Sequence, residues 1–238
     1  TLFRSSAFDP MATSHVGAAG LWQFMVPTAK HYGLTVNSLI DERRDPIKSS
    51  RAAAKYLKDL YNSFGDWTLA IAAYNCGRNN VLKAIKRAGG ARDYWAIYPY
   101  LPRETRGYVP AFIAANYVMN YYCDHKIPAM KTIAPAETDT VVVTRSLHLG
   151  QVAAACNLDF ETVQAMNPQY RTGVVPGNSQ PCALRLPMAS IDRFLQLGDS
   201  IYQLTPAVEV AERREEVEPA EVEVESKQAN TRQSRRQA

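Results

Sequence analysis

The chain has 238 residues, of which 46% are hydrophobic and 21% are charged, and its net charge is +4. This is enough to bury the core of one medium domain and a small second one, and no run approaches the ~18 apolar residues of a membrane span. Residues 1–130 carry 16 basic against 9 acidic residues, a balance that suits an anionic polymer. The basic residues do not alternate with stacking aromatics as in a nucleic-acid groove, so we expect no nucleic-acid partner.

The first two-thirds of the sequence predicts helices separated by turn residues. Between Asp45 and Gly65, apolar residues recur at helical spacing, which indicates an amphipathic helix. Asp66 is placed to N-cap a second, nearly all-apolar helix, WTLAIAAYN, which Gly77 follows. The tyrosine-asparagine pair at the end of this buried helix is unusual, because polar groups at the end of an apolar helix usually face a site.

Shorter helical pieces are expected next. NNVLKAIKRAGG predicts a third helix that stops at its glycines. The aromatic-rich stretch 94–122 is expected to be divided by three prolines: Pro99, Pro102 and Pro110. No alternating strand pattern occurs before residue 130, so the front of the chain should be mainly α.

The pattern changes after a segment rich in proline, alanine and threonine. TVVVT (140–144) and CALRLP (182–187) predict strands, and GQVAAAC and DFETVQAMN between them predict short helices, the second N-capped by Asp159. The result is a small β-α-α-β module. From Pro206 onward the chain is rich in glutamate and lacks aromatics, so we expect it to be disordered, with an edge strand in EVEVE as the alternative.

Cysteine and histidine give no sign of a metal site. His15 and His31 are isolated, and no CxxC pair occurs. We therefore expect no metal and no cofactor. The cysteines are interpreted as buried free thiols, with a bridge between the last two as the alternative: Cys76, Cys123, Cys156 and Cys182.

Three segments carry the chemistry of the sequence: SSAFDPMATSHVGAAGLWQFMVPTA, AIAAYNCG and LPRETRGYVPAF. In order and spacing they resemble the motifs of the glycoside hydrolase family 23 lytic transglycosylases, and within them the membrane-bound lytic murein transglycosylase D group. The resemblance covers about residues 5 to 125. It implies a goose-lysozyme-like helical fold and cleavage of peptidoglycan between N-acetylmuramic acid and N-acetylglucosamine, which leaves a 1,6-anhydro sugar end.

Such cleavage needs one carboxylic acid, which protonates the leaving oxygen and then, as a base, takes the proton of the muramyl 6-hydroxyl. The resemblance places the family's catalytic glutamate on Ser5 and its serine on Ser6. A serine hydroxyl is too weak an acid for this step, so the chain as written should be inactive or nearly so. Two interpretations are open: a binding-only relative that lost its acid, or a chain whose first five residues are foreign. We favour the second, because the resemblance stops just before Ser6.

The remaining motif positions are intact. By resemblance, Gly20 and Gln23 line the glycan cleft with Ser6, Tyr74 and Asn75 contact the sugar or the acid, and Tyr108 completes the site wall. Amide and phenol groups can hydrogen-bond the acetamido and hydroxyl groups of such a sugar.

Structural roles compete with these assignments. Gly20 could simply open a helix, and Trp22 is interpreted as core. Asp9 should cap a turn before Pro10, and Glu104 should make a structural hydrogen bond to the backbone or an arginine. Neither acid is therefore expected to replace the missing glutamate.

The β-α-α-β module resembles a LysM domain, a peptidoglycan and chitin binder, through ETVQAMNP, the Pro-Gly turn and the closing LRLP. It departs from LysM where RSLHLG replaces the usual Gly-Asp-(Ser/Thr)-Leu turn, which leaves its glycan affinity open. We expect a mainly α catalytic domain, a LysM-like module and a disordered tail. The boundaries are a domain over 1–128, N-terminally truncated, a linker over 129–138, the module over 139–188, a short extension over 189–205 and the tail over 206–238.

The leading hypothesis is a lytic transglycosylase of the bacterial cell envelope, periplasmic or attached to the membrane through a missing N-terminus. It would act as a monomer on peptidoglycan glycan strands. The alternative is a catalytically inactive peptidoglycan-binding relative, since Ser5 replaces the acid. A third hypothesis is hydrolysis, with water instead of the 6-hydroxyl as nucleophile.

Overall fold

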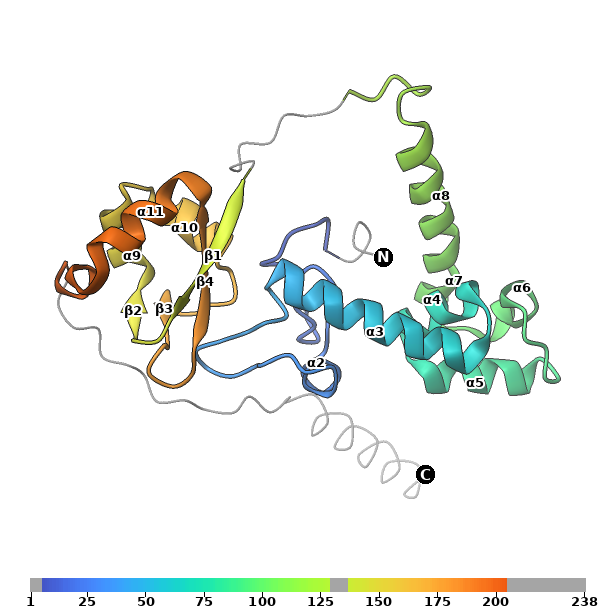
Figure 1. Cartoon of the computed structure of the whole chain (residues 1–238). Helices are drawn as coiled ribbons and strands as arrows, with labels where there is room; N and C mark the ends of the chain where they lie inside the picture. The colour runs from blue at the N-terminus through green and yellow to red at the C-terminus, as the bar shows by residue number, and fades with distance from the viewer. Residues whose placement is uncertain (1–5, 129–136, 205–238) are drawn as a thin grey trace, which may run out of the picture.

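The computed structural model describes residues 6–128 and 137–204 (Figure 1). Ser5, most of the predicted linker and the charged tail lie outside these residues. Helices make up the front of the described chain: α2 (Val26–His31), α3 (Pro46–Phe64), α4 (Trp67–Cys76), α5 (Arg78–Arg87), α6 (Tyr94–Ile97), the 3₁₀ turn η1 (Tyr98–Tyr100), α7 (Arg103–Arg106) and α8 (Tyr108–Tyr121). Within residues 6–128 and 137–204, none of the helices combines the length and apolar character that crossing a bilayer requires.

Helix α3 follows the predicted amphipathic pattern. The Asp45 carboxylate accepts hydrogen bonds from the amides of Ile47 and Lys48, and Gly65 ends the helix with a left-handed φ of 72°. Leu60 and Phe64 are buried on one face. In Figure 1, α3 runs from the side of the small module to the group formed by α4, α5 and α7.

Helix α4 is the buried centre of that group. Asp66 caps it by accepting from the amide of Leu69 at 2.9 Å, and residues Leu69 to Ala73 are all buried. The predicted break at Pro110 is wrong. This proline lies in the first turn of α8, where its missing N–H costs no helical hydrogen bond.

The module over residues 137–204 has the predicted β-α-α-β order. Strand β1 (Thr138–Val143) pairs antiparallel with β4 (Cys182–Pro187), with Val141 opposite Leu184. Helices α9 (Leu149–Cys156) and α10 (Phe160–Met166) lie between them in the chain, and a second short pair joins β2 (Leu147–His148) to β3 (Val174–Val175). The Asp159 side chain makes no cap hydrogen bond.

Two further elements complete the module. Helix α11 (Met188–Leu197) and the 3₁₀ turn η2 (Gly198–Gln203) lie in the segment that the sequence suggested as a short extension. Phe194 and Ile201 are buried in the same cluster as the strands. This segment therefore packs as part of the module.

The cysteines are all free, so the alternative of a bridge between Cys156 and Cys182 is wrong. These two thiols are buried, as expected. Cys76 is half-buried and Cys123 is exposed, so the interpretation as buried thiols does not extend to Cys123.

Candidate functional site

The first motif begins with a tight turn. Ser6 is buried, and its hydroxyl donates to the carbonyl of Leu21 at 2.8 Å. Asp9 accepts from the amide of Met11 at 2.8 Å, across Pro10, as predicted. The turn thus fixes Ser6 against the loop that follows.

That loop carries Gly20 and Gln23. Gly20 has a φ of 79°, and a Cβ atom at this position would lie 1.8 Å from the carbonyl oxygen of Arg43. Gln23 also has a positive φ, of 50°, and its side-chain amide donates to the carbonyls of Gly20 at 2.8 Å and Ala12 at 3.2 Å. The backbone of Gly20 is therefore held by close packing, and it does not open a helix.

The second motif meets the first through Tyr74. Its hydroxyl donates to the carbonyl of Trp22 at 2.9 Å, and the two rings pack edge to face with centroids 6.3 Å apart. Burial, together with the phenols of Tyr108 and Tyr56, raises the pKa of Tyr74 well above its ordinary value. Tyr74 is therefore a neutral donor at physiological pH. Trp22 packs against a buried cluster, which agrees with its assignment to the core.

The third motif meets the second through Asn75. The hydroxyl of Thr105 donates to the Asn75 side-chain oxygen at 2.8 Å. Tyr108 is buried at the start of α8. The Glu104 side chain is exposed, and within the described part of the chain it has no hydrogen bond or ion pair, so the structural bond expected for it is wrong.

The structure thus brings the three motifs together. Direct hydrogen bonds join Ser6 to Leu21, Tyr74 to Trp22, and Thr105 to Asn75. Asp9 and Glu104 are both exposed. His15 and His31 are exposed as well, and residues 6–128 and 137–204 contain no group of three side chains that could hold a metal.

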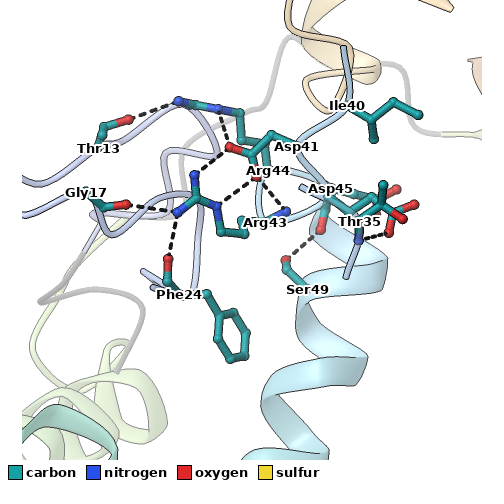
Figure 2. A network of polar contacts seen from close by, with 12 residues as sticks. Thr13, Gly17, Phe24, Thr35, Ile40, Asp41, Arg43, Arg44, Asp45 and Ser49 are labelled. Carbon is teal, nitrogen blue, oxygen red and sulfur yellow. Dashed lines mark hydrogen bonds and ion pairs between the residues drawn. The ribbon is translucent and has the colours of Figure 1, made fainter. Parts of the chain in front are cut away.

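One part of this arrangement was not foreseen from the sequence. Figure 2 shows Arg43 between three partners: its guanidinium donates to both oxygens of Asp41, each at 2.9 Å, and to the carbonyls of Gly17 at 2.9 Å and Phe24 at 3.1 Å. Both charged residues are buried, Asp41 at 1% exposure and Arg43 at 5%. In the sequence, DERRD reads as a solvated run of charges, and no local pattern marks one arginine of it as internal.

The module keeps its fold although RSLHLG departs from the LysM pattern. His148 caps α9: its Nδ1 accepts from the amide of Gly150 at 3.0 Å, and the Gln151 side chain accepts from the His148 amide at 2.8 Å. The His148 ring also stacks on Phe160. A histidine therefore supplies the cap acceptor in this turn.

Comparison with known proteins agrees with this geometry. Residues 4–97 match the family model of the transglycosylase SLT domain, and residues 137–203 match the "Lytic transglycosylase MltD, LysM-like domain". The first match includes position 5, and the second extends through α11 and η2. The class that the fold and the motifs define is therefore that of the lytic transglycosylases.

Individual relatives narrow the class. The chain is 32% identical over 193 residues to membrane-bound lytic murein transglycosylase D of Escherichia coli K12, which covers 79% of this chain and 42% of that protein. It is also 32% identical over 129 residues to the soluble lytic murein transglycosylase of the same strain, which covers 52% of this chain and 20% of that protein. More particularly, then, the chain combines an SLT domain with a LysM-like domain of the MltD type, and it spans less than half the length of these relatives.

Among solved structures, the 70 kDa soluble lytic transglycosylase of Escherichia coli is similar over 51% of this chain and 21% of that one, at 30% identity and a TM-score of 0.44.

Proposed function

We propose that the surface shared by the three motifs binds peptidoglycan glycan strands, and that cleavage there between N-acetylmuramic acid and N-acetylglucosamine forms 1,6-anhydro ends when position 5 carries a glutamate. The observation that supports this most is that hydrogen bonds join Tyr74 to the first motif and Asn75 to the third, while the Ser6 hydroxyl closes the first motif on Leu21. The relative from Escherichia coli is named for murein, and the proposal adopts that substrate.

In this proposal the binding residues are Ser6, Gly20, Gln23, Tyr74, Asn75 and Tyr108. Tyr74, whose pKa burial raises further above physiological pH, donates its hydroxyl to the Trp22 carbonyl and so orients the loop next to the sugar. Asn75 keeps its side-chain N–H groups for an acetamido carbonyl, because its oxygen accepts from Thr105. The same proposal includes the domain division 1–128, 129–138, 139–188 and 206–238, with the extension 189–205 packed on the module. It also includes a monomeric state and a place in the cell envelope.

In this proposal the acid comes from position 5, because the carboxyl groups of the other motif residues are exposed to solvent and none is buried near Tyr74 and Asn75. Asp9 holds the Met11 amide, and the Glu104 side chain is exposed to solvent on α7. A glutamate at position 5 would protonate the leaving oxygen and then accept the proton of the muramyl 6-hydroxyl. The second candidate function, an inactive peptidoglycan binder, follows directly from the serine at this position.

A substitution at position 5 distinguishes the transglycosylase from the inactive peptidoglycan binder. Ser5→Glu should release anhydro-muropeptides from purified cell-wall sacculi, whereas the parent chain and Ser5→Gln, the matched variant without an acid, should release none. Release is measured by chromatography and mass spectrometry. If Ser5→Glu remains inactive while all three proteins sediment with sacculi, the inactive binder is the correct function.

The products also decide between transglycosylation and hydrolysis. Attack by the muramyl 6-hydroxyl leaves an anhydro end, which is one water lighter than the reducing end left by hydrolysis. We expect only anhydro ends from Ser5→Glu. Reducing-end muramic acid in the mass spectrum would contradict the transglycosylase mechanism.

A further inference from the structure

The loop over residues 35–45 belongs to two structural units at once. It precedes α3 in the front domain, yet Leu39 and Ile40, at 3% and 4% exposure, are buried in the hydrophobic cluster of the module. The Asp41 amide donates to the Gln169 carbonyl at 2.8 Å, and the Arg171 amide donates to the Leu39 carbonyl at 3.0 Å. The module is thus docked on this loop by both backbone hydrogen bonds and apolar burial.

The docked loop is also bonded to the segment over residues 17–24, which contains Gly20 and Gln23. The Asp41 carboxylate fixes Arg43, whose guanidinium binds the Gly17 and Phe24 carbonyls at the two ends of that segment (Figure 2). The Arg43 carbonyl packs directly against Gly20. A buried arginine paired on both sides has few alternative positions, because any shift would leave a charge without a partner.

These contacts form one continuous path. Asp41 is its central residue: its amide bonds to the module, and its side chain bonds to the arginine that holds the segment over residues 17–24. The loop over 37–41 has no helix or strand of its own beyond an isolated bridge between Val36 and Asp41 and one between Ile40 and Tyr170. Because the module covers its apolar side chains, undocking would expose them and free the Asp41 amide.

We propose that the LysM-like module acts as a brace for the glycan-binding segment: docking at Leu39 and Ile40 positions Gly20 and Gln23 through Asp41 and Arg43. Asp41 and Arg43 are positioning residues, since they act through the backbone of the segment. The module would then support the site from within the fold, whether or not it binds glycan itself. Only the link to glycan affinity rests on the proposed function.

Backbone amide exchange measured by NMR on the full chain tests the brace directly. Leu39→Asp/Ile40→Asp puts two carboxylates into an apolar cluster and cannot remain docked. The Arg171 amide reports docking, because it donates to the Leu39 carbonyl. The amides of Gly20 and Phe24, which donate to the Ala12 and Ala19 carbonyls, report the segment.

We expect the Arg171, Gly20 and Phe24 amides to exchange at least about tenfold faster in the double variant. The Gly77 amide at the end of α4 should be unchanged, which excludes general unfolding of the front domain. The control Ile47→Asp makes the same chemical change at a residue that is 42% exposed, and it should leave all four amides unchanged. Unchanged protection at Gly20 and Phe24 in the double variant would overturn the brace, even if the whole module unfolded.

A second variant tests whether the coupling between the docked loop and the segment runs through Arg43. Arg43→Lys keeps the positive charge but cannot bind Asp41, Gly17 and Phe24 together, because an ammonium lacks the planar fork. The Gly20 and Phe24 amides should exchange faster, while the Arg171 amide stays protected. If the Gly20 and Phe24 amides stay protected in this variant, the coupling does not run through Arg43 and the proposal is wrong.

Binding of a soluble chitin oligosaccharide, measured by calorimetry, connects the brace to function. The affinity should fall about fivefold to tenfold in Arg43→Lys, which leaves the module docked, because binding must then order the segment as well. An unchanged affinity would show that the brace does not serve the site. If the parent chain does not bind the oligosaccharide at all, the proposed function fails, whereas the exchange result still decides whether the brace exists.

Discussion

At the scale of single residues, the backbone geometry at Gly20 constrains the candidate site. Its φ of 79° lies in the left-handed region, and the nearest atom to a Cβ there belongs to the Arg43 backbone. That backbone cannot yield easily, because the Arg43 side chain is fixed on Asp41, Gly17 and Phe24. Only glycine fits at this position.

Gly20→Ala should therefore lower the free energy of unfolding by about 2–4 kcal/mol, which combines the cost of the left-handed backbone with that of the overlap. Gly33→Ala is the matched control, since Gly33 has a φ of 82° but no atom within 4 Å of its added Cβ. It should lose only about 1 kcal/mol. Urea unfolding followed by tryptophan fluorescence measures both, and equal losses would contradict the packing argument.

How well the sequence predicts a contact depends on how far apart its two residues lie in the chain. Asp45, Gly65 and Asp66 act on amides within a few positions, so the ends of α3 and α4 could be predicted from local spacing. The docking of the module on the loop over 35–45 could not be predicted, because the residues that meet are far apart in the sequence. The Arg171 guanidinium, for example, donates to the Asn37 carbonyl across 134 positions. The burial of Arg43 was missed for the same reason, since its partners Gly17 and Phe24 lie in another segment.

At the scale of elements, helix α4 carries Tyr74 and Asn75 to the site, so its capped start matters for function. Burial of Asp66 opposes its ionisation, but hydrogen bonds from the Thr68 hydroxyl and the Leu69 amide outweigh this effect and lower its pKa below 3.8. A carboxyl whose pKa is lower in the folded state stabilises the fold above the unfolded pKa. That contribution is lost as the pH falls through the folded value.

Asp66→Asn should therefore flatten the loss of stability between about pH 4 and pH 2, because an amide keeps an acceptor for Leu69 but does not titrate. At pH 7 it should cost less than Asp66→Ala, which removes the cap and costs about 1 kcal/mol. Asp124→Asn is the control, since Asp124 is exposed and its side chain makes no hydrogen bond or ion pair within the described residues. Urea unfolding at a series of pH values measures the effect, and parallel pH curves for Asp66→Asn and the parent would refute it.

At the scale of the whole molecule, sequence order and structural units do not coincide. Leu39 precedes every helix of the α3–α8 group, yet it is buried with the strands of the module. All three tryptophans, Trp22, Trp67 and Trp95, lie in the front domain, so their fluorescence reports the unfolding of that domain and not of the module.

A substitution in the front domain should accordingly destabilise the LysM-like module. Leu39→Ala should lower the stability of the module by about 2–4 kcal/mol, because it leaves a cavity in the module cluster. NMR signals of Val141 and Leu184 should be lost at lower urea than the tryptophan transition. Leu60→Ala, a truncation at the same 3% exposure but in the cluster around α4, should show the reverse order. If Leu39→Ala shifts the tryptophan transition and spares the module, Leu39 stabilises its own domain and the two units are not joined through this loop.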